Sequence, residues 1–141
     1  MKKALVALMS VVLGIILVGC TSQPAPESQM ESVKGTVAYR ERIALPPNAV
    51  VTISLQDISL ADAPAIVLAK QTFSTDGEQV PFDFELSYDA AEIDSRHRYS
   101  VSARIEIDGK LRFITDTNYS VITDEAKTKQ VALMLKGISG Q

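Results

Sequence analysis

The residues that could carry out catalysis are few and widely separated in this sequence of 141 residues. His97 is the single histidine, and it lies between Arg96 and Arg98. Two neighbouring cations disfavour the protonated imidazole, and nothing around it suggests a Ser-His-Asp order, so we expect His97 to be a solvated loop or strand-start residue. The seven glycines are scattered, without the Gly-x-Gly arrangement of phosphate-binding loops. The sequence predicts neither an enzyme nor a cofactor.

One pair of acidic residues has a spacing that some hydrolases use. On a strand, Asp83 and Glu85 would share one face with their carboxylates roughly 6–7 Å apart, which overlaps the range found in glycosidases. Acidic residues that alternate along a strand usually belong to its solvent face, and we assign this pair to that face. Zinc sites need clusters of His or Cys, and calcium sites need several oxygens in one loop. We predict no metal site, because five further acidic residues near predicted strand ends lack such spacing: Asp57, Asp62, Asp116, Asp124 and Glu125.

Cys20 is the single cysteine, and it follows a segment with the features of a secretory signal. Lys2 and Lys3 precede an apolar run at 4–18. As a helix this run would span about 22 Å, which is short of the ~30 Å hydrocarbon core, so it predicts a cleaved signal rather than a membrane-spanning helix. The sequence LVGC at 17–20 resembles the lipobox of bacterial lipoproteins.

This resemblance implies that residues 1–19 are removed and that Cys20 is acylated on its sulfur and on its new amine. Each buried CH₂ group contributes about 0.8 kcal/mol, so two or three acyl chains, such as palmitate, would hold the protein firmly in the lipid bilayer. In this class of proteins, Thr21 in place of Asp favours the outer membrane. We therefore expect a lipid-anchored protein on the periplasmic face of the outer membrane.

The residues after Cys20 predict a tether. The segment 21–32 is rich in Pro, Ser, Gln and Glu and has one sizeable apolar residue, Met30. Such a composition buries too little surface to offset chain entropy, so we assign 20–32 to the lipidated cysteine and a short disordered linker. The formal net charge is -3. This acidic balance argues against a nucleic-acid partner, which would require a basic face.

Residues 33–141 have apolar side chains at every second position, a period typical of half-buried strands. Turn signals separate these runs, and the length is enough to bury a core. The pattern predicts an all-β domain, a single antiparallel β-sandwich of about seven or eight strands. The clearest alternating runs are Val51–Leu55, Phe82–Leu86, Tyr99–Ile107 and Val131–Leu135.

One turn can be predicted in detail. Asp108-Gly109 would normally form a two-residue hairpin loop, but that register would place Arg112 opposite Ile105 on the inner face. A three-residue loop, with Gly109 in the left-handed conformation, would instead direct Leu111 and Phe113 inward. We therefore predict the three-residue loop.

Several segments together resemble one protein family: LPPNAV at 45–50, ISLADAP at 58–64, PFDFELSY at 81–88 and FITDT at 113–117. They are similar to the YbaY family of Gram-negative lipoproteins, which includes the YscW-type lipoprotein, or pilotin, of type III secretion systems. The resemblance covers nearly the whole mature domain. It implies an outer-membrane β-domain without a catalytic motif, and it implies for the pilotin branch the binding of secretin subunits.

The most distinctive binding candidate is the segment 44–65. Ile58 and Leu60 either present an apolar ridge to a partner, with Asp62 closing a turn beside them, or pack under a long loop as part of the core. We hypothesise a lipoprotein that acts through protein–protein contact, in its concrete form a pilotin-like chaperone for a secretin or another envelope or secretion-system protein.

The alternative function is an envelope lipoprotein that binds a glycan or another small ligand. Glycan binding uses exposed aromatic side chains, and this sequence contains no Trp and four Tyr. Exposure of Tyr39, Tyr88 and Tyr119 together would favour this alternative.

Overall fold

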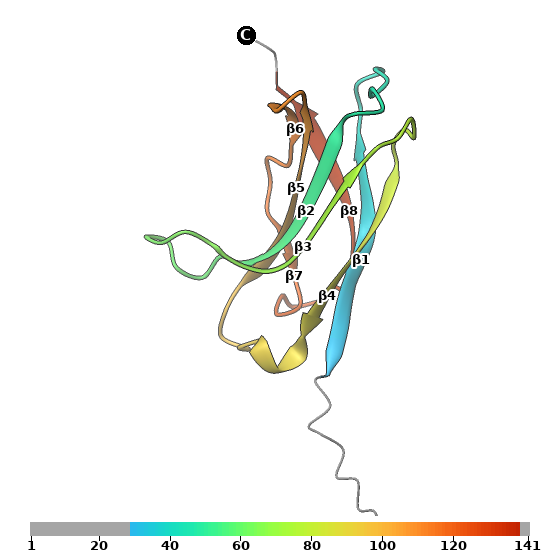
Figure 1. The fold of residues 1–141 in the computed structure, drawn as a ribbon. Helices are drawn as coiled ribbons and strands as arrows, with labels where there is room; N and C mark the ends of the chain where they lie inside the picture. The colour runs from blue at the N-terminus through green and yellow to red at the C-terminus, as the bar shows by residue number, and fades with distance from the viewer. Residues whose placement is uncertain (1–28, 139–141) are drawn as a thin grey trace, which may run out of the picture.

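The computed structural model describes residues 29–138, which form an all-β domain, as predicted (Figure 1). A single turn of 3₁₀-helix, Ala90–Glu92, follows the fourth strand. Among residues 29–138, no helix has the length and apolar character needed to cross a membrane. The eight strands are β1 (Met30–Tyr39), β2 (Val50–Asp57), β3 (Ile66–Ser74), β4 (Phe82–Asp89), β5 (Tyr99–Ile107), β6 (Lys110–Ile114), β7 (Tyr119–Val121) and β8 (Gln130–Gly137).

The strands form one mixed sheet that curls into a nearly closed, barrel-like shape. Their order is β3-β2-β5-β6-β8-β1-β4, and β7 pairs with β5. The two ends of this order, β3 and β4, lie next to each other: Gln71 Oε1 accepts a hydrogen bond of 3.1 Å from the Glu85 amide, and the rings of Phe73 and Phe82 meet edge to face. The predicted sandwich of separate sheets is therefore only partly correct.

The predicted antiparallel arrangement is wrong at one place, where β1 pairs with β8 in parallel. Gly35 lies opposite Val131 in this ladder. The two strands stand at opposite ends of the domain sequence. Alternation within a strand carries no information on the direction of such a distant neighbour, because the period is two in either direction.

The folded domain begins before residue 33, where we placed its boundary. Met30 and Ser32, which we assigned to the linker, pair with Asp89 and Ser87 at the start of β1. Their exposed or half-buried side chains explain the error, because backbone hydrogen bonds form a ladder without apolar side chains. The predicted signal and the linker up to residue 28, together with Cys20, lie outside the described residues.

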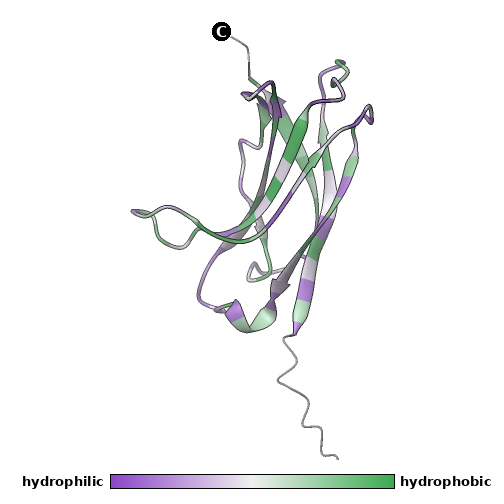
Figure 2. Cartoon of the chain, in the orientation of Figure 1, coloured by the Kyte–Doolittle hydropathy of each residue, from purple (hydrophilic) through white to green (hydrophobic). Residues whose placement is uncertain are grey.

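The core follows the predicted alternation. In β4, Phe82, Phe84, Leu86 and Tyr88 are buried, and the residues between them are exposed. Val51, Ile53 and Leu55 of β2 are likewise fully buried. Figure 2 shows the alternation as bands of hydrophobic and hydrophilic residues along the strands. The side chains between these buried positions point outward, and they form the surfaces on which a partner can bind.

The predicted three-residue loop between β5 and β6 is wrong. Ile107 pairs with Lys110, so Asp108 and Gly109 form a two-residue turn, and both have positive φ, at 52° and 76°, as a type I′ turn requires. The register is corrected farther along by a bulge at Arg112.

This bulge has opposite consequences for the two side chains that we expected to point inward. Phe113 pairs with Ile105 and is 2% exposed, as predicted, whereas Leu111 precedes the bulge and is 37% exposed. The apolar pattern thus selected the inner face correctly for Phe113, but a bulge rather than a longer loop supplies the extra residue.

Candidate functional site

The loop between β2 and β3 carries the predicted partner-binding residues, and it projects away from the body of the barrel (Figure 1). Leu60 is 65% exposed and Asp62 is also exposed, whereas Ile58 is half-buried. Of the two alternatives considered for this segment, packing under a long loop does not apply to Leu60. The structure instead places it in the solvent.

Two further apolar residues extend this exposed surface at the start of β3. Ile66 is 59% exposed and Val67 is 50% exposed. Neither residue was among those predicted to bind a partner, although a signal was present: two successive residues of a strand point to opposite faces, so Ile66 and Val67 cannot both face the core. We call Leu60, Ile66 and Val67 the apolar loop surface.

The root of the β2–β3 loop is held by hydrogen bonds. Asp57 Oδ1 accepts from the amide of Ser59 at 2.9 Å and from its hydroxyl at 2.6 Å. The Arg98 amide donates to Ser59 Oγ at 2.8 Å, and the Ile58 amide donates to the Arg98 carbonyl at 2.9 Å. These bonds fix the direction in which the loop leaves the barrel, since they join its first residues to the segment that precedes β5.

His97 is an exposed residue of the loop just before β5, as predicted, but its electrostatic surroundings differ from those expected from its neighbours in sequence. Its Nδ1 lies 2.7 Å from Asp57 Oδ2, and its Nε2 lies 3.7 Å from Asp94 Oδ2. The Arg96 guanidinium forms two bonds with Asp94, of 3.0 and 3.1 Å, and shares Asp94 Oδ2 with His97. Carboxylates, rather than cations, therefore face the imidazole ring. The long-range pairing of β2 with β5 brings Asp57 to this position.

The same bonds affect the acidity of both carboxyl groups. Hydrogen bonds from Arg96 lower the pKa of Asp94 to about 2, and hydrogen bonds from Ser59 lower the pKa of Asp57, with a smaller contribution from His97. Asp57 lies between Ser59 and His97. A nucleophilic triad requires the histidine in that middle position, so this cluster holds the loop and does not activate the Ser59 hydroxyl.

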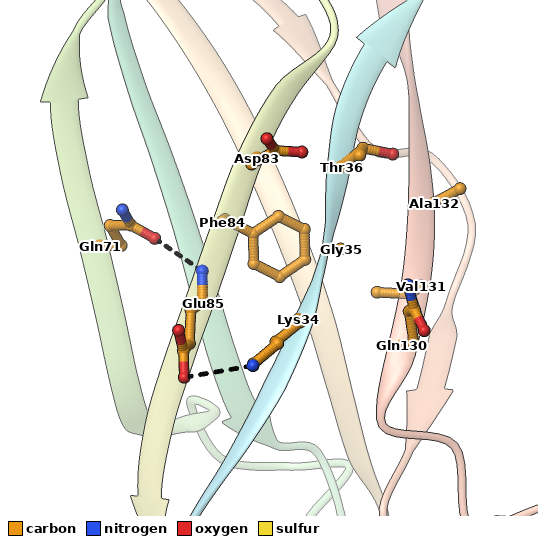
Figure 3. Close-up of a pocket in the computed structure, with 10 residues that line it drawn as sticks. All are labelled: Lys34, Gly35, Thr36, Gln71, Asp83, Phe84, Glu85, Gln130, Val131 and Ala132. Carbon is orange, nitrogen blue, oxygen red and sulfur yellow. Dashed lines mark hydrogen bonds and ion pairs between the residues drawn. The ribbon is translucent and has the colours of Figure 1, made fainter.

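Asp83 and Glu85 lie on the exposed face of β4, as predicted, at the hollow shown in Figure 3. The hollow has a volume of about 700 Å³ and lies over β1, β4 and β8, with Gln71 of β3 at its side. Glu85 forms an ion pair of 3.9 Å with Lys34, and both side chains are more than half exposed. Water reaches both of these charges, so the hollow lacks the enclosed, desolvated acid that glycoside hydrolysis requires.

The tyrosines do not form an exposed aromatic surface. Tyr39 and Tyr88 are buried, and Tyr119 is half-buried. Burial, together with the hydrogen bond that its hydroxyl donates to Glu31, raises the pKa of Tyr88 to about 12. The feature that would have favoured glycan binding is therefore missing at these three residues. Within residues 29–138, no group of three or more His, Cys, Asp or Glu side chains could hold a metal ion.

Comparison with known proteins places this chain in a family. A family model described as type III secretion system lipoprotein chaperone (YscW) matches residues 28–135. The uncharacterized lipoprotein YbaY of Escherichia coli (strain K12) is 44% identical over 117 residues, which are 83% of this chain and 60% of that protein. The chain thus spans about three fifths of the length of this curated relative.

A solved structure is also similar, the alternative pilotin from the type II secretion system of Vibrio cholerae. It is 66% identical, with a TM-score of 0.77, over 79% of this chain and the whole of the solved chain. The chain therefore belongs to the YscW family of lipoprotein chaperones, as its sequence motifs indicated.

Proposed function

We propose that this protein is an outer-membrane lipoprotein, anchored through acylated Cys20, that acts as a pilotin-like chaperone. Its partner would be a secretin or another component of a secretion system in the envelope. Membership of the YscW family and similarity to a type II secretion pilotin support this proposal. The protein works by binding and not by catalysis.

The observation that carries the proposal is the apolar loop surface. A partner that covers apolar side chains on a projecting loop stabilises the complex by roughly 25 cal/mol for each Å² of apolar surface removed from water. Contiguous exposed apolar surface on a soluble domain commonly marks a protein-binding site. Leu60 on the loop and Val67 at its base are exposed apolar residues, whereas Ile66, also exposed, points to the opposite face of β3 from Val67; Ile58 and Asp62 flank Leu60 at the same loop.

Crosslinking in cells tests the proposal directly. A photoreactive side chain placed at Leu60, at Ile58 or at Lys70 should trap one dominant protein, and mass spectrometry should identify it as a secretin or another envelope component. The same substitution at Leu111 is the control, because Leu111 is also exposed but lies on β6, which β2 and β5 separate from β3 in the sheet order.

Leu60→Asp should abolish the crosslink from Ile58 by introducing a charge into the apolar contact, and Leu111→Asp should leave it unchanged. Circular dichroism should show that both variants remain folded. If the folded, membrane-anchored protein yields no crosslink at Leu60, or a crosslink that Leu60→Asp does not affect, the proposed binding surface is wrong.

A further inference from the structure

The outer face of β2 and β5 carries a group of hydroxyl side chains. Its central positions are occupied by Thr52 and Ser54 of β2 and Ser102 of β5. In the ladder, Ser54 lies between Ser102 on one side and Lys70 of β3 on the other. Together with Arg104, these residues line a trough of about 280 Å³, which we call the hydroxyl trough.

Two hydroxyls of this trough, those of Thr52 and Ser54, belong to largely buried residues, and Ser102 is half-buried. Thr52 and Ser54 are each 9% exposed, although their side chains point away from the core. Other threonine hydroxyls in the domain donate to protein oxygens, for instance Thr75 to the Pro46 carbonyl and Thr128 to Asp124. Within residues 29–138, no such bond is formed by the side chains of Thr52, Ser54 or Ser102. Buried hydroxyls are normally paired with protein or with water, and the hydroxyls of this open trough are available to a ligand that displaces the water.

Two cations border the trough. The side chain of Lys70 forms no ion pair with any residue in the described part of the chain. Arg104 pairs with Glu106 through Nε at 3.1 Å, and its side chain remains 52% exposed. Cations beside hydroxyl donors recognise a carboxylate through charge-assisted hydrogen bonds. The positive border is notable because the whole chain carries a net charge of -3.

The trough is continuous with the apolar loop surface. Val67 lines the trough and also belongs to that surface, and Gln56, which pairs with Val67 in the ladder, lies between the trough and the root of the loop. The volume accommodates one or two side chains rather than a whole helix. A segment bound here would therefore place a carboxylate in the trough and apolar residues on the loop.

We propose that the hydroxyl trough binds an Asp or Glu side chain of an acidic, amphipathic segment of the partner protein. Its apolar residues pack on Leu60 and Val67, while its carboxylate bonds to Lys70, Arg104 and the hydroxyls of Thr52 and Ser54. This inference rests on the proposed function, because it assigns a chemical class to the partner of the same surface.

A peptide titration tests the chemistry of the trough. The probe is a fluorescent peptide, acetyl-Leu-Glu-Ser-Leu-Glu-Ser-Leu-amide, and its matched control has Gln in place of both Glu. Anisotropy is measured with the full chain in a neutral detergent. We expect saturable binding of the Glu peptide, at least about tenfold weaker binding of the Gln peptide, and weakening of the Glu peptide's binding by salt.

Variants locate the site. Lys70→Glu should weaken binding of the Glu peptide by about tenfold, and Arg104→Gln should weaken it as well, because each removes a cation from the trough. Lys110→Glu is the matched control: it makes the same change of charge at an exposed residue of β6 and should have no effect. Thermal unfolding should confirm that each variant is folded. If Lys70→Glu does not fold, Arg104→Gln still tests the site.

Three results would overturn the inference: equal binding of the Glu and Gln peptides, equal effects of Lys70→Glu and Lys110→Glu, or displacement of the peptide by inorganic phosphate at concentrations at which acetate has no effect. The last result would assign the trough to a phosphate group. If Leu60 still crosslinks to a partner and Lys70→Glu does not affect this crosslink, the proposed function stands. Only the inference that the partner presents an acidic segment would then be wrong.

Discussion

His97 and Asp57 join segments 40 residues apart, and their contact shows how single side chains orient the β2–β3 loop. The bond lies at the root of the β2–β3 loop, where Ser59 adds two further bonds to Asp57. Thr123 donates to the His97 carbonyl at 2.6 Å, so the connection before β8 is tied to the same point. Three connections of the barrel therefore meet beside the apolar loop surface.

At the residue scale we predict acid sensitivity that depends on Asp57. The folded-state pKa values of Asp57 and Asp94 lie below those of the unfolded chain, so their contribution to stability is present above about pH 4 and is lost as the pH falls toward 2. Urea denaturation between pH 2 and 5 measures the free energy of unfolding. As the pH falls, this free energy should decrease less for Asp57→Asn than for the unchanged protein.

The control for this prediction is Asp62→Asn, which changes an exposed carboxylate of the same loop. It should retain the pH dependence of the unchanged protein. Identical pH profiles for Asp57→Asn and the unchanged protein would contradict the assignment of this acid sensitivity to Asp57.

At the element scale, the parallel contact of β1 and β8 depends on a glycine. A Cβ atom at Gly35 would lie 1.8 Å from the Val131 carbonyl oxygen and 2.9 Å from Phe84 Cζ. The first of these atoms belongs to the backbone of β8 and cannot move without disturbing the ladder. Gly35 thus permits the close approach that joins the first and last strands.

We predict that Gly35→Ala destabilises the domain by about 3 kcal/mol, at the upper end of typical overpacking costs, because β8 must shift. Urea denaturation at neutral pH measures the change. Thr36→Ala is the control: the next residue of β1 points to the opposite face, and its substitution should cost less than 1 kcal/mol, roughly what surface changes cost. Equal stability of Gly35→Ala and the unchanged protein would refute the close packing of β1 against β8 at this residue.

On the scale of the whole molecule, the sequence limits the distance between the predicted anchor and the barrel. Nine residues lie between Cys20 and Met30, the first residue of β1, and a chain of that length spans at most about 35 Å. An anchor at Cys20 would therefore hold the barrel, together with its projecting loop, near the membrane surface. A partner that reaches the same membrane would encounter the loop at a raised local concentration.

We predict that Cys20→Ser prevents acylation and removes the protein from the outer membrane, because no thiol remains to carry the diacylglyceryl group. Fractionation of cells and labelling with a palmitate analogue measure both effects. Thr21→Asp is the control, since the resemblance to lipoproteins predicts an acylated protein retained at the inner membrane. Persistence of Cys20→Ser in the outer-membrane fraction would exclude Cys20 as the anchor.

The sequence by itself determined the all-β class and, in the clearest strands, which side chains face the core. Alternation with a period of two is a local property, so the buried residues of β2, β4 and β5 could be predicted without knowledge of any neighbour. The family could be recognised for a similar reason, because its motifs are contiguous. The acylation of Cys20 stays a prediction, as this residue lies outside the described part of the chain.

Only the tertiary structure decided the features that depend on distant pairing. The parallel alignment of β1 with β8, the bulge at Arg112 and the contact of His97 with Asp57 each join residues whose proximity is set by neighbouring strands. The exposure of Leu60 was also decided by the tertiary structure, because the neighbouring elements determine whether a loop is buried or projects into solvent. Local periodicity encodes which face a residue takes, whereas the partner it meets there is fixed by the packing of the whole chain.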